Sequence, residues 1–181
     1  MARLACCGFL LLLGVAACRD STPKTSAGTT ASPGAAALTA GEHTLAVPDG
    51  KIWYKKVGTG TGTPVILLHG GPGFNSFYLK PLEAIGSDRP VIRYDQLGGG
   101  KSDKIADTTL FNIAHFVREL DSLRAALGYD KVQLVGHSWG VILAYEYYRA
   151  HPEHVTSLVL ASAPLDIPAY EKRARSLISK T

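Results

Sequence analysis

The fold of this chain is decided by the stretch Val132-Gln133-Leu134-Val135-Gly136-His137-Ser138-Trp139-Gly140. Its first four residues form a short, mostly apolar run of the kind found in strands that are covered on both faces. Residues 140–150 are typical of a helix, which should end before Pro152 because the residue preceding a proline disfavours helical geometry. The stretch therefore predicts a strand, a sharp turn and a helix in direct succession.

The turn carries the pattern G-x-S-x-G, with Ser138 at its centre. Gly136 and Gly140 leave room for neighbouring backbone, and His137 and Trp139 flank the serine. Between a strand and a helix, this pattern predicts a nucleophile elbow that projects the serine hydroxyl into a cleft. The backbone amide of Trp139, at the helix N-terminus, is then expected to point at an oxyanion. We therefore predict that Ser138 is a nucleophile.

A second motif, His69-Gly70-Gly71-Pro72-Gly73, follows the apolar run Val65 to Leu68. Three glycines and a proline make a rigid loop whose backbone can approach a ligand without side-chain clash. Alone, the motif is equally well explained as a tight turn. Paired with the elbow, it predicts a loop whose amides supply the second oxyanion donor.

A third motif is Tyr94-Asp95-Gln96-Leu97-Gly98-Gly99-Gly100-Lys101-Ser102-Asp103. A glycine-rich loop with a lysine suggests phosphate binding, but the spacing is not that of a P-loop and no helix is expected to start at Lys101. We interpret the segment as structural. Asp95, Gln96 and Gly98 are expected to turn the chain beneath the nucleophile and to orient the oxyanion loop.

Four short apolar runs suit the strands of a parallel sheet. They are Val65 to His69, Val91 to Tyr94, Val132 to Val135, and Ser157 to Ala161. Helical segments alternate with these runs, which predicts a β-α-β architecture with ligands bound beyond the carboxyl ends of the strands. The three motifs all fall at those ends.

Two earlier segments predict an antiparallel hairpin at the edge of the sheet. They are His43 to Val47 and Lys51 to Val57, joined by the turn residues Pro48-Asp49-Gly50. The turn residues permit the tight reversal that a hairpin needs. We expect both segments to be antiparallel edge strands.

The clearest helix is expected over residues 110–127, where apolar residues recur at helical spacing. Thr108 or Thr109 is expected to cap its start, and Gly128 to end it. This pattern places His115 on the polar side of the helix.

The first 18 residues have the layout of an export signal, with Arg3, an apolar run from Phe9 to Ala17, and small residues before Cys18. The apolar run is too short to span a membrane. Residues 15–18, Val-Ala-Ala-Cys, resemble the lipobox of bacterial lipoproteins, whose cysteine is acylated and becomes the N-terminus. We expect an exported lipoprotein anchored to the cell envelope. An ordinary cleaved signal, with a secreted or periplasmic product, is the alternative.

Composition limits the remaining possibilities. Residues 19–41 are almost wholly small and polar, which predicts a flexible tether, and all three cysteines precede it, so no disulfide can staple the folded part. An apolar fraction of 46% indicates a globular core. The net charge of +4 is mild, and the cationic cluster near the end is better explained as a solvated helix face than as a nucleic-acid site. No metal or organic cofactor site is expected.

The three motifs HGGPG, YDQLGGGKSD and GHSWG, in this order and spacing, resemble the proline iminopeptidase (prolyl aminopeptidase) family of α/β-hydrolases. The resemblance implies Ser138 as nucleophile, the amides of Gly71 and Trp139 as the oxyanion hole, and His69 as a support for the oxyanion loop. Two departures are Val141, where many relatives have a smaller residue, and Gly99, where many have cysteine. Neither is expected to be disabling.

The implied fold is the N-terminal half of an α/β-hydrolase, a mostly parallel sheet with an antiparallel N-terminal hairpin, helices on both faces, and no C-terminal strands. The partial domain is expected over residues 42–165 and the start of the helical cap over residues 166–181. The family's acid and histidine follow that cap, so we expect both to be absent from this chain. Asp166 lies where some α/β-hydrolases place the acid, although this family places it one strand later. Four local histidines are expected to be structural or solvated: His115, His137, His151 and His154.

The resemblance implies removal of N-terminal residues, proline by preference, from short peptides through an acyl-serine intermediate. A peptide would be the partner, with no nucleic acid, and membrane contact would come through the lipid anchor alone. One alternative is an esterase or amidase of the same fold. Another is an inactive truncated fragment or binding module, whose exposed sheet edge invites aggregation. Epoxide hydrolases and haloalkane dehalogenases share the loop pattern but need aspartate at the position of Ser138.

Overall fold

The computed structural model describes residues 39–164 and 166–179. The predicted signal segment, the lipobox with Cys18 and nearly all of the predicted tether lie outside the described residues. The strands are β1 (Gly41–Val47), β2 (Gly50–Val57), β3 (Val65–Leu68), β4 (Val91–Asp95), β5 (Val132–His137) and β6 (Val155–Ala161). The α-helices are α2 (Ile113–Ala126), α3 (Trp139–Ala150) and α4 (Ile167–Ile178). Three 3-10 helices complete the elements: η1 (Phe77–Ser87), η2 (Thr108–Leu110) and η3 (Pro152–His154).

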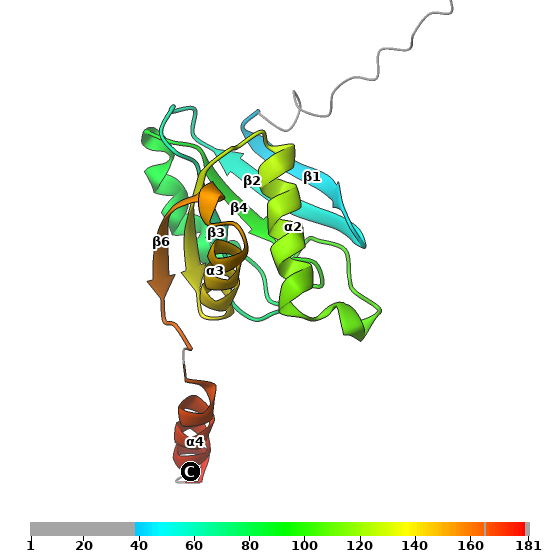
Figure 1. Cartoon of the computed structure of the whole chain (residues 1–181), viewed down its shortest axis with the longest axis vertical. Helices are drawn as coiled ribbons and strands as arrows, with labels where there is room; N and C mark the ends of the chain where they lie inside the picture. The colour runs from blue at the N-terminus through cyan, green and yellow to red at the C-terminus, as the bar shows by residue number, and fades with distance from the viewer. Residues whose placement is uncertain (1–38, 165, 180–181) are drawn as a thin grey trace, which may run out of the picture. The chain divides into compact units, whose positions relative to one another are not determined.

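One six-stranded sheet organises the fold, with the strand order β1-β2-β4-β3-β5-β6 (Figure 1). β3 lies between β4 and β5 and pairs with both in parallel, and β6 adds to β5 in parallel. The four predicted apolar runs are therefore strands, and the mostly parallel sheet is confirmed. All four residues of β3 are buried, as expected for a central strand that is covered on both faces.

The N-terminal hairpin forms as predicted, but one of its strands is not an edge. β1 and β2 pair antiparallel, with Val47 opposite Gly50, and Asp49 between them adopts a positive φ of 74°. β2 also pairs antiparallel with β4. Its residues Ile52 and Tyr54 are buried in the core, so β2 is an interior strand and the prediction that it is an edge strand was wrong.

Alternate residues of the central strands supply two separate cores, one on each face of the sheet. Ile66 and Leu68 pack with the buried faces of α2 and α3. Val65 and Leu67 pack on the other face with Leu79 of η1. The predicted cover on both faces is confirmed.

The helix predicted over residues 110–127 begins later than expected. Its N-cap is Asn112, whose side-chain oxygen accepts a 2.9 Å hydrogen bond from the backbone N–H of His115. The prediction of a cap at Thr108 or Thr109 was wrong, because those residues form η2. Gly128 follows the helix with a positive φ of 72°, as predicted for a C-terminal stop.

His115 is not on a polar face. Its side chain is 2% exposed, and its Nδ1 lies 3.5 Å from Oδ2 of Asp49 in the turn of the hairpin. The hairpin turn thus covers the first turn of α2. Helical periodicity places a residue on its own helix but does not reveal which loops pack against it, so the expectation was wrong.

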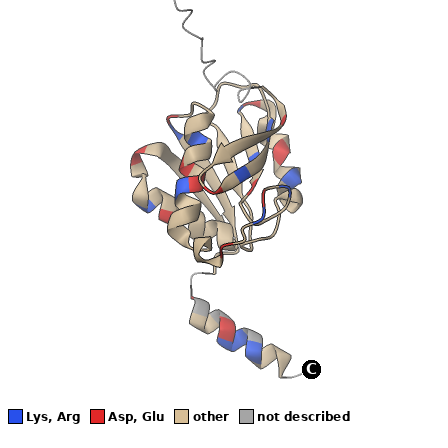
Figure 2. Ribbon diagram, turned by 90° about the vertical axis from the view of Figure 1, so that its right-hand side faces the viewer, with Lys and Arg blue, Asp and Glu red and all other residues tan. Residues whose placement is uncertain are grey.

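Positions of both charge signs are scattered along the ribbon of the sheet domain and along α4 (Figure 2). In contrast, β6 presents apolar side chains to solvent, with Val159 54% and Leu160 42% exposed. On the face of the sheet to which Val159 points, a depression of about 500 Å³ is lined by residues of β3, β5 and β6 and by the end of η1 with the two residues after it. Within residues 39–164 and 166–179, no helix is both long and apolar enough to cross a membrane.

Candidate active site

Ser138 lies at the sharp bend between β5 and α3, where the sequence places it. Its φ of 54° and ψ of −119° belong to a region that non-glycine residues rarely adopt. Such a conformation costs roughly 1–3 kcal/mol and persists only where surrounding contacts impose it. The backbone N–H of Ser138 donates a 3.0 Å hydrogen bond to the carbonyl of Ala161, which ties the bend to β6.

Two glycines allow this bend to pack tightly. A Cβ placed on Gly136 would run into the carbonyl oxygen of Gly140, and one placed on Gly140 would run into the carbonyl oxygen of Leu68. Backbone atoms cannot move aside as flexible side chains can. The spacing of the two glycines in G-x-S-x-G is therefore a requirement of the bend between strand and helix.

The loop after β3 lies directly beside the serine. Gly70, Gly71 and Ser138 line one pocket of about 270 Å³, together with Phe74, Tyr78 and His137. A Cβ on Gly70 would lie 3.2 Å from the Cβ of Ser138. The two predicted motifs, 68 residues apart at Gly70 and Ser138, are thus brought together by neighbouring parallel strands.

Two backbone N–H groups near Ser138 have no acceptor among the described residues. Gly71 has a positive φ of 129° and a cis peptide bond to Pro72, and no described residue accepts a hydrogen bond from its N–H. Trp139 is the first residue of α3, so its N–H lies outside the hydrogen-bond ladder of the helix. Both are suited to bind an oxyanion, which is the role predicted for them.

His69 is buried behind the oxyanion loop. Its Nε2 accepts a 3.0 Å hydrogen bond from the backbone N–H of Gln96. An amide N–H can only donate, so the ring proton is on Nδ1, which lies 2.7 Å from the carbonyl oxygen of Gly70 and donates to it. Burial lowers the pKa of His69, which keeps the ring neutral. Both ring nitrogens are used, and the contacts fit the predicted supporting role.

Gln96 connects the oxyanion loop to the elbow. Its side-chain nitrogen donates to the carbonyl of His69 at 3.1 Å, and its side-chain oxygen accepts from Nε1 of Trp139 at 3.0 Å. Gln96 itself is fully buried. The loop after β4 therefore contacts both the HGGPG loop and the elbow, and these contacts fit the orienting role predicted for it.

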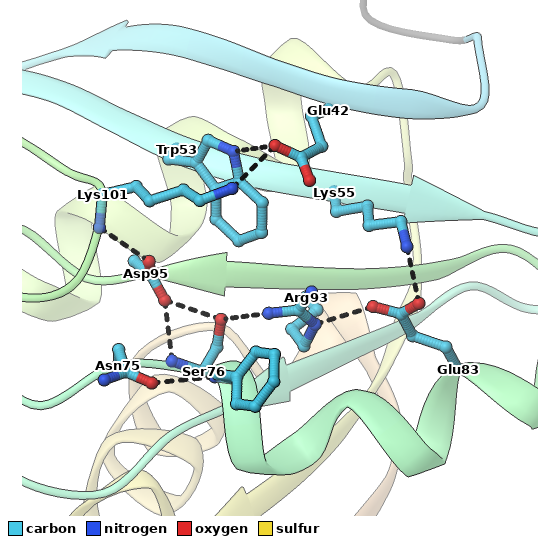
Figure 3. A network of polar contacts seen from close by, with 10 residues as sticks. Glu42, Trp53, Lys55, Asn75, Ser76, Glu83, Arg93, Asp95 and Lys101 are labelled. Carbon is cyan, nitrogen blue, oxygen red and sulfur yellow. Dashed lines mark hydrogen bonds and ion pairs between the residues drawn. The ribbon is translucent and has the colours of Figure 1, made fainter.

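Asp95 holds the far side of the oxyanion loop. One carboxylate oxygen accepts hydrogen bonds from both the backbone N–H and the hydroxyl of Ser76, and the other accepts from the backbone N–H of Lys101 (Figure 3). Arg93 also donates to the hydroxyl of Ser76 at 3.0 Å, and its Nε donates to Glu83 at 2.7 Å. This buried network fixes the end of the oxyanion loop where η1 begins.

Among the described residues, no hydrogen bond joins Ser138 to any of the histidines predicted to be structural or solvated. The Nδ1 of His137 lies 2.9 Å from the hydroxyl of Tyr78. His151 caps the C-terminus of α3, and His154 is in η3. Asp166 caps the N-terminus of α4 by accepting from the backbone N–H of Ala169, so here it has a structural role.

Two residues of this region were missed by the sequence analysis. Tyr78 lines the pocket of Ser138, but it lies on η1, which contains Pro81 and for which the sequence analysis predicted no element. Glu119 is buried on α2 and accepts a 3.0 Å hydrogen bond from the backbone N–H of Leu97. Helical spacing places Glu119 among the apolar residues of its helix, which is an unusual position for a carboxyl group. The sequence analysis assigned no role to it. Among the described residues, no three His, Cys, Asp or Glu side chains gather as metal ligands do.

Comparison with known proteins agrees with this geometry. Residues 63–177 match the family model of the alpha/beta hydrolase fold. The chain is 44% identical over 140 residues to a proline iminopeptidase of Heyndrickxia coagulans, which covers 77% of this chain and 49% of that protein. The chain thus spans about half the length of this curated relative.

Solved structures share the same architecture. The crystal structure of a proline iminopeptidase of Mycobacterium smegmatis superposes with a TM-score of 0.71 and 28% identity, over 77% of this chain and 50% of that one. An epoxide hydrolase from Vigna radiata superposes with a TM-score of 0.60 and 26% identity, over 66% of this chain and 38% of that one. The family match, the sheet order and the serine elbow together show that this chain belongs to the α/β-hydrolase family and is similar in sequence to its proline iminopeptidases.

Proposed function

We propose that Ser138 is the nucleophile of a serine hydrolase, and that the complete protein is an aminopeptidase that releases N-terminal residues, proline by preference. The observation that carries the proposal is the strained conformation of Ser138 beside the loop of Gly70 and Gly71 in a single pocket. A backbone strain of this kind is retained where it positions a reacting group.

In the proposed reaction, the hydroxyl oxygen of Ser138 attacks the carbonyl carbon of the N-terminal residue. The tetrahedral oxyanion is stabilised by the N–H groups of Gly71 and Trp139. The carbon–nitrogen bond then breaks, the serine proton passes through a base to the departing amine, and water hydrolyses the acyl-serine. Loss of one oxyanion donor typically costs about 3 kcal/mol of transition-state stabilisation.

The base in this reaction is proposed to come from outside the described residues. Both ring nitrogens of His69 are engaged by backbone groups, and His137 is hydrogen-bonded to Tyr78. A serine hydroxyl reacts slowly without a neighbouring base. The relatives' greater length provides room for an acid and a histidine, as the resemblance implies.

The preference for an N-terminal proline is supported by the names of the relatives, among them the enzymes of Heyndrickxia coagulans and Clostridium botulinum. The pocket beside Ser138 has the aromatic side chains of Phe74 and Tyr78 in its wall, which suits an apolar ring.

Two assays test the proposal: labelling of this polypeptide, and hydrolysis by a chain extended to the length of its relatives so that the base is supplied, each with a Ser138→Ala control. A fluorophosphonate probe should label Ser138, with formation of an oxygen–phosphorus bond and loss of fluoride, and the adduct is located by peptide mass spectrometry. Prolyl p-nitroanilide should be hydrolysed faster than its alanyl analogue and than p-nitrophenyl acetate. Labelling with faster ester cleavage would indicate an esterase. No labelling that depends on Ser138 would show that this polypeptide is not a competent hydrolase.

We also propose that Cys18 carries a lipid anchor that holds the protein at the cell envelope. The support is the sequence Val-Ala-Ala-Cys after an apolar run. Metabolic labelling with an alkyne-bearing fatty acid should modify the wild-type protein and leave the Cys18→Ser variant unmodified. Equal incorporation in both would contradict the anchor.

A further inference from the structure

The hydroxyl of Tyr78 lies between the two motifs that form the site. The backbone N–H of Gly70 donates to it at 2.7 Å, and Nδ1 of His137 lies 2.9 Å from it. The rings of Tyr78 and His137 also meet edge to face, with centroids 5.2 Å apart. A single side chain from η1 therefore contacts both the oxyanion loop and the elbow.

The direction of the hydrogen bond with Gly70 is fixed by the groups involved. An amide N–H can only donate, so the oxygen of Tyr78 accepts from Gly70. The phenol keeps its own proton, because burial raises the pKa of Tyr78 above its usual value. That proton can be donated to Nδ1 of His137, and with this direction the ring proton of His137 is on Nε2.

The contact with Tyr78 also distinguishes the two glycine amides of the oxyanion loop. The N–H of Gly70 is used by Tyr78, whereas no described residue accepts from the N–H of Gly71. A Cβ on Gly70 would lie 3.2 Å from the Cβ of Ser138 and 3.4 Å from the hydroxyl oxygen of Tyr78. The phenol therefore fixes the loop where it passes closest to the serine, one residue before the free amide.

The side chain of Tyr78 is 37% exposed, but the backbone that carries it is fixed two residues earlier. Ser76, two residues before Tyr78, is fully buried and forms hydrogen bonds with Asp95 and Arg93 in the network of Figure 3. After Ser76 the backbone enters η1, so the position of Tyr78 is set from the opposite side of the loop.

The segment 74–78 separates two hollows of the surface. Phe74 and Tyr78 line the pocket of Ser138. Asn75 and Phe77 line a depression of about 460 Å³ above the network of Asp95. The side chains of this segment thus point to different hollows: Tyr78 reaches the serine pocket, and Asn75 and Phe77 face the charged network.

We propose that Tyr78 is a positioning residue of the Ser138 site, whose hydroxyl joins the amide of Gly70 to the imidazole of His137 and so sets the distance between the oxyanion loop and the nucleophile elbow. Its effect on reactivity rests on the proposed function of Ser138. The contact that joins the two segments does not depend on that proposed function, and it can be measured in the absence of any reaction.

Tyr78→Phe removes the hydroxyl and keeps the ring, and Tyr145→Phe is the matched control. Tyr145 lies on α3, its side chain is 49% exposed, and no hydrogen bond of its hydroxyl is found among the described residues. Three measurements are made on each 181-residue protein: amide hydrogen exchange at Gly70, imidazole nitrogen NMR of His137, and the rate at which a fluorophosphonate labels Ser138.

In Tyr78→Phe, exchange at Gly70 should be about fivefold faster, as expected when one hydrogen bond of ordinary strength is lost. The imidazole resonances of His137 should change from one fixed tautomer to an average of two. The labelling rate of Ser138 should fall about tenfold, because the oxyanion loop is less precisely placed. Tyr145→Phe should match the wild type in all three measurements.

Unchanged exchange at Gly70 together with unchanged His137 resonances would overturn the proposal. So would a normal labelling rate in a Tyr78→Phe protein whose exchange and tautomer had changed, since the contact would then have no positioning role. If wild-type Ser138 is not labelled at all, the hydrolase proposal fails for this polypeptide. The exchange and NMR results then decide by themselves whether Tyr78 joins the two segments.

Discussion

The indole Nε1 of Trp139 donates a 3.0 Å hydrogen bond to the side-chain oxygen of Gln96. These residues are 43 positions apart in the chain and belong to the first turn of α3 and the loop after β4. The amide of the same Trp139 is a proposed oxyanion donor, so the hydrogen bond fixes the residue from its side-chain end. Through its other contact, to the carbonyl of His69, Gln96 links both proposed donor segments.

Replacing Gln96 with leucine tests this link. Gln96→Leu keeps the volume and removes both side-chain hydrogen bonds, which leaves the partly buried indole N–H of Trp139 and the carbonyl of His69 without these partners. We expect the free energy of unfolding to fall by about 2–4 kcal/mol in urea titration, and labelling of Ser138 by a fluorophosphonate to slow. Gln133→Leu, near the start of β5, is the control and should cost under about 1.5 kcal/mol with normal labelling. Equal behaviour of the two variants would contradict the linking role.

The strain at Ser138 predicts an unusual order of stabilities. Glycine tolerates a φ of 54° and a ψ of −119° better than alanine does, so Ser138→Gly should be about 1 kcal/mol more stable than Ser138→Ala in urea titration. Both variants should lose fluorophosphonate labelling. A glycine variant less stable than the alanine variant would show that the elbow stores no strain.

Gly140 packs against backbone atoms whereas Gly128 faces open space, so an added methyl group should cost different amounts of stability at the two positions. Gly140→Ala directs its Cβ at the carbonyl oxygen of Leu68, and should lose at least about 3 kcal/mol or fail to fold. Gly128→Ala has nothing within 4 Å of its Cβ and bears only the strain of a positive φ of 72°, so it should lose about 1 kcal/mol. Thermal and urea unfolding of both variants check the difference. Similar losses would mean that the backbone at residue 140 has room to shift.

Glu119 predicts a stability that falls as the pH rises. Burial raises its pKa from 4.5 to about 8, so between these values the folded state holds a proton that the unfolded state has released. Stability from this group is therefore complete below about pH 4.5 and decreases by up to about 1.4 kcal/mol per pH unit toward pH 8. Glu119→Gln keeps an acceptor for the N–H of Leu97 and should flatten this slope in urea titrations at pH 5, 6.5 and 8. An unchanged slope would assign the pH dependence to other groups.

The exposed apolar face of β6 predicts self-association of the 181-residue polypeptide. Val159 is 54% exposed beside an edge whose backbone groups are unpaired among the described residues. Val159→Lys should raise the monomer fraction in sedimentation velocity, whereas Tyr148→Lys, on α3 with 42% exposure at the tyrosine, should not. Equal effects of the two lysines would indicate a general charge effect.

Local patterns in the sequence were sufficient for much of the fold. The alternation of apolar runs and helices predicts the parallel strands, because each pattern reports burial within its own segment. The G-x-S-x-G spacing predicts the elbow, because two close backbone contacts admit only glycine at residues 136 and 140. The roles proposed for Ser138, Gly71 and Trp139 rest on the same local patterns together with the family resemblance.

Contacts between distant segments were decided by the tertiary structure alone. The sequence does not show that β2 lies inside the sheet, that Asp49 covers His115, or that Tyr78 meets His137 across 59 residues. Each of these contacts depends on how the elements pack against one another. Such contacts join residues that are far apart in the sequence, so no periodic pattern within one segment reveals them. The sequence by itself therefore predicted the strands, the main helices and the position of the proposed nucleophile, because each is encoded in a local pattern. The tertiary structure decided which side chains hold the HGGPG loop and the elbow together.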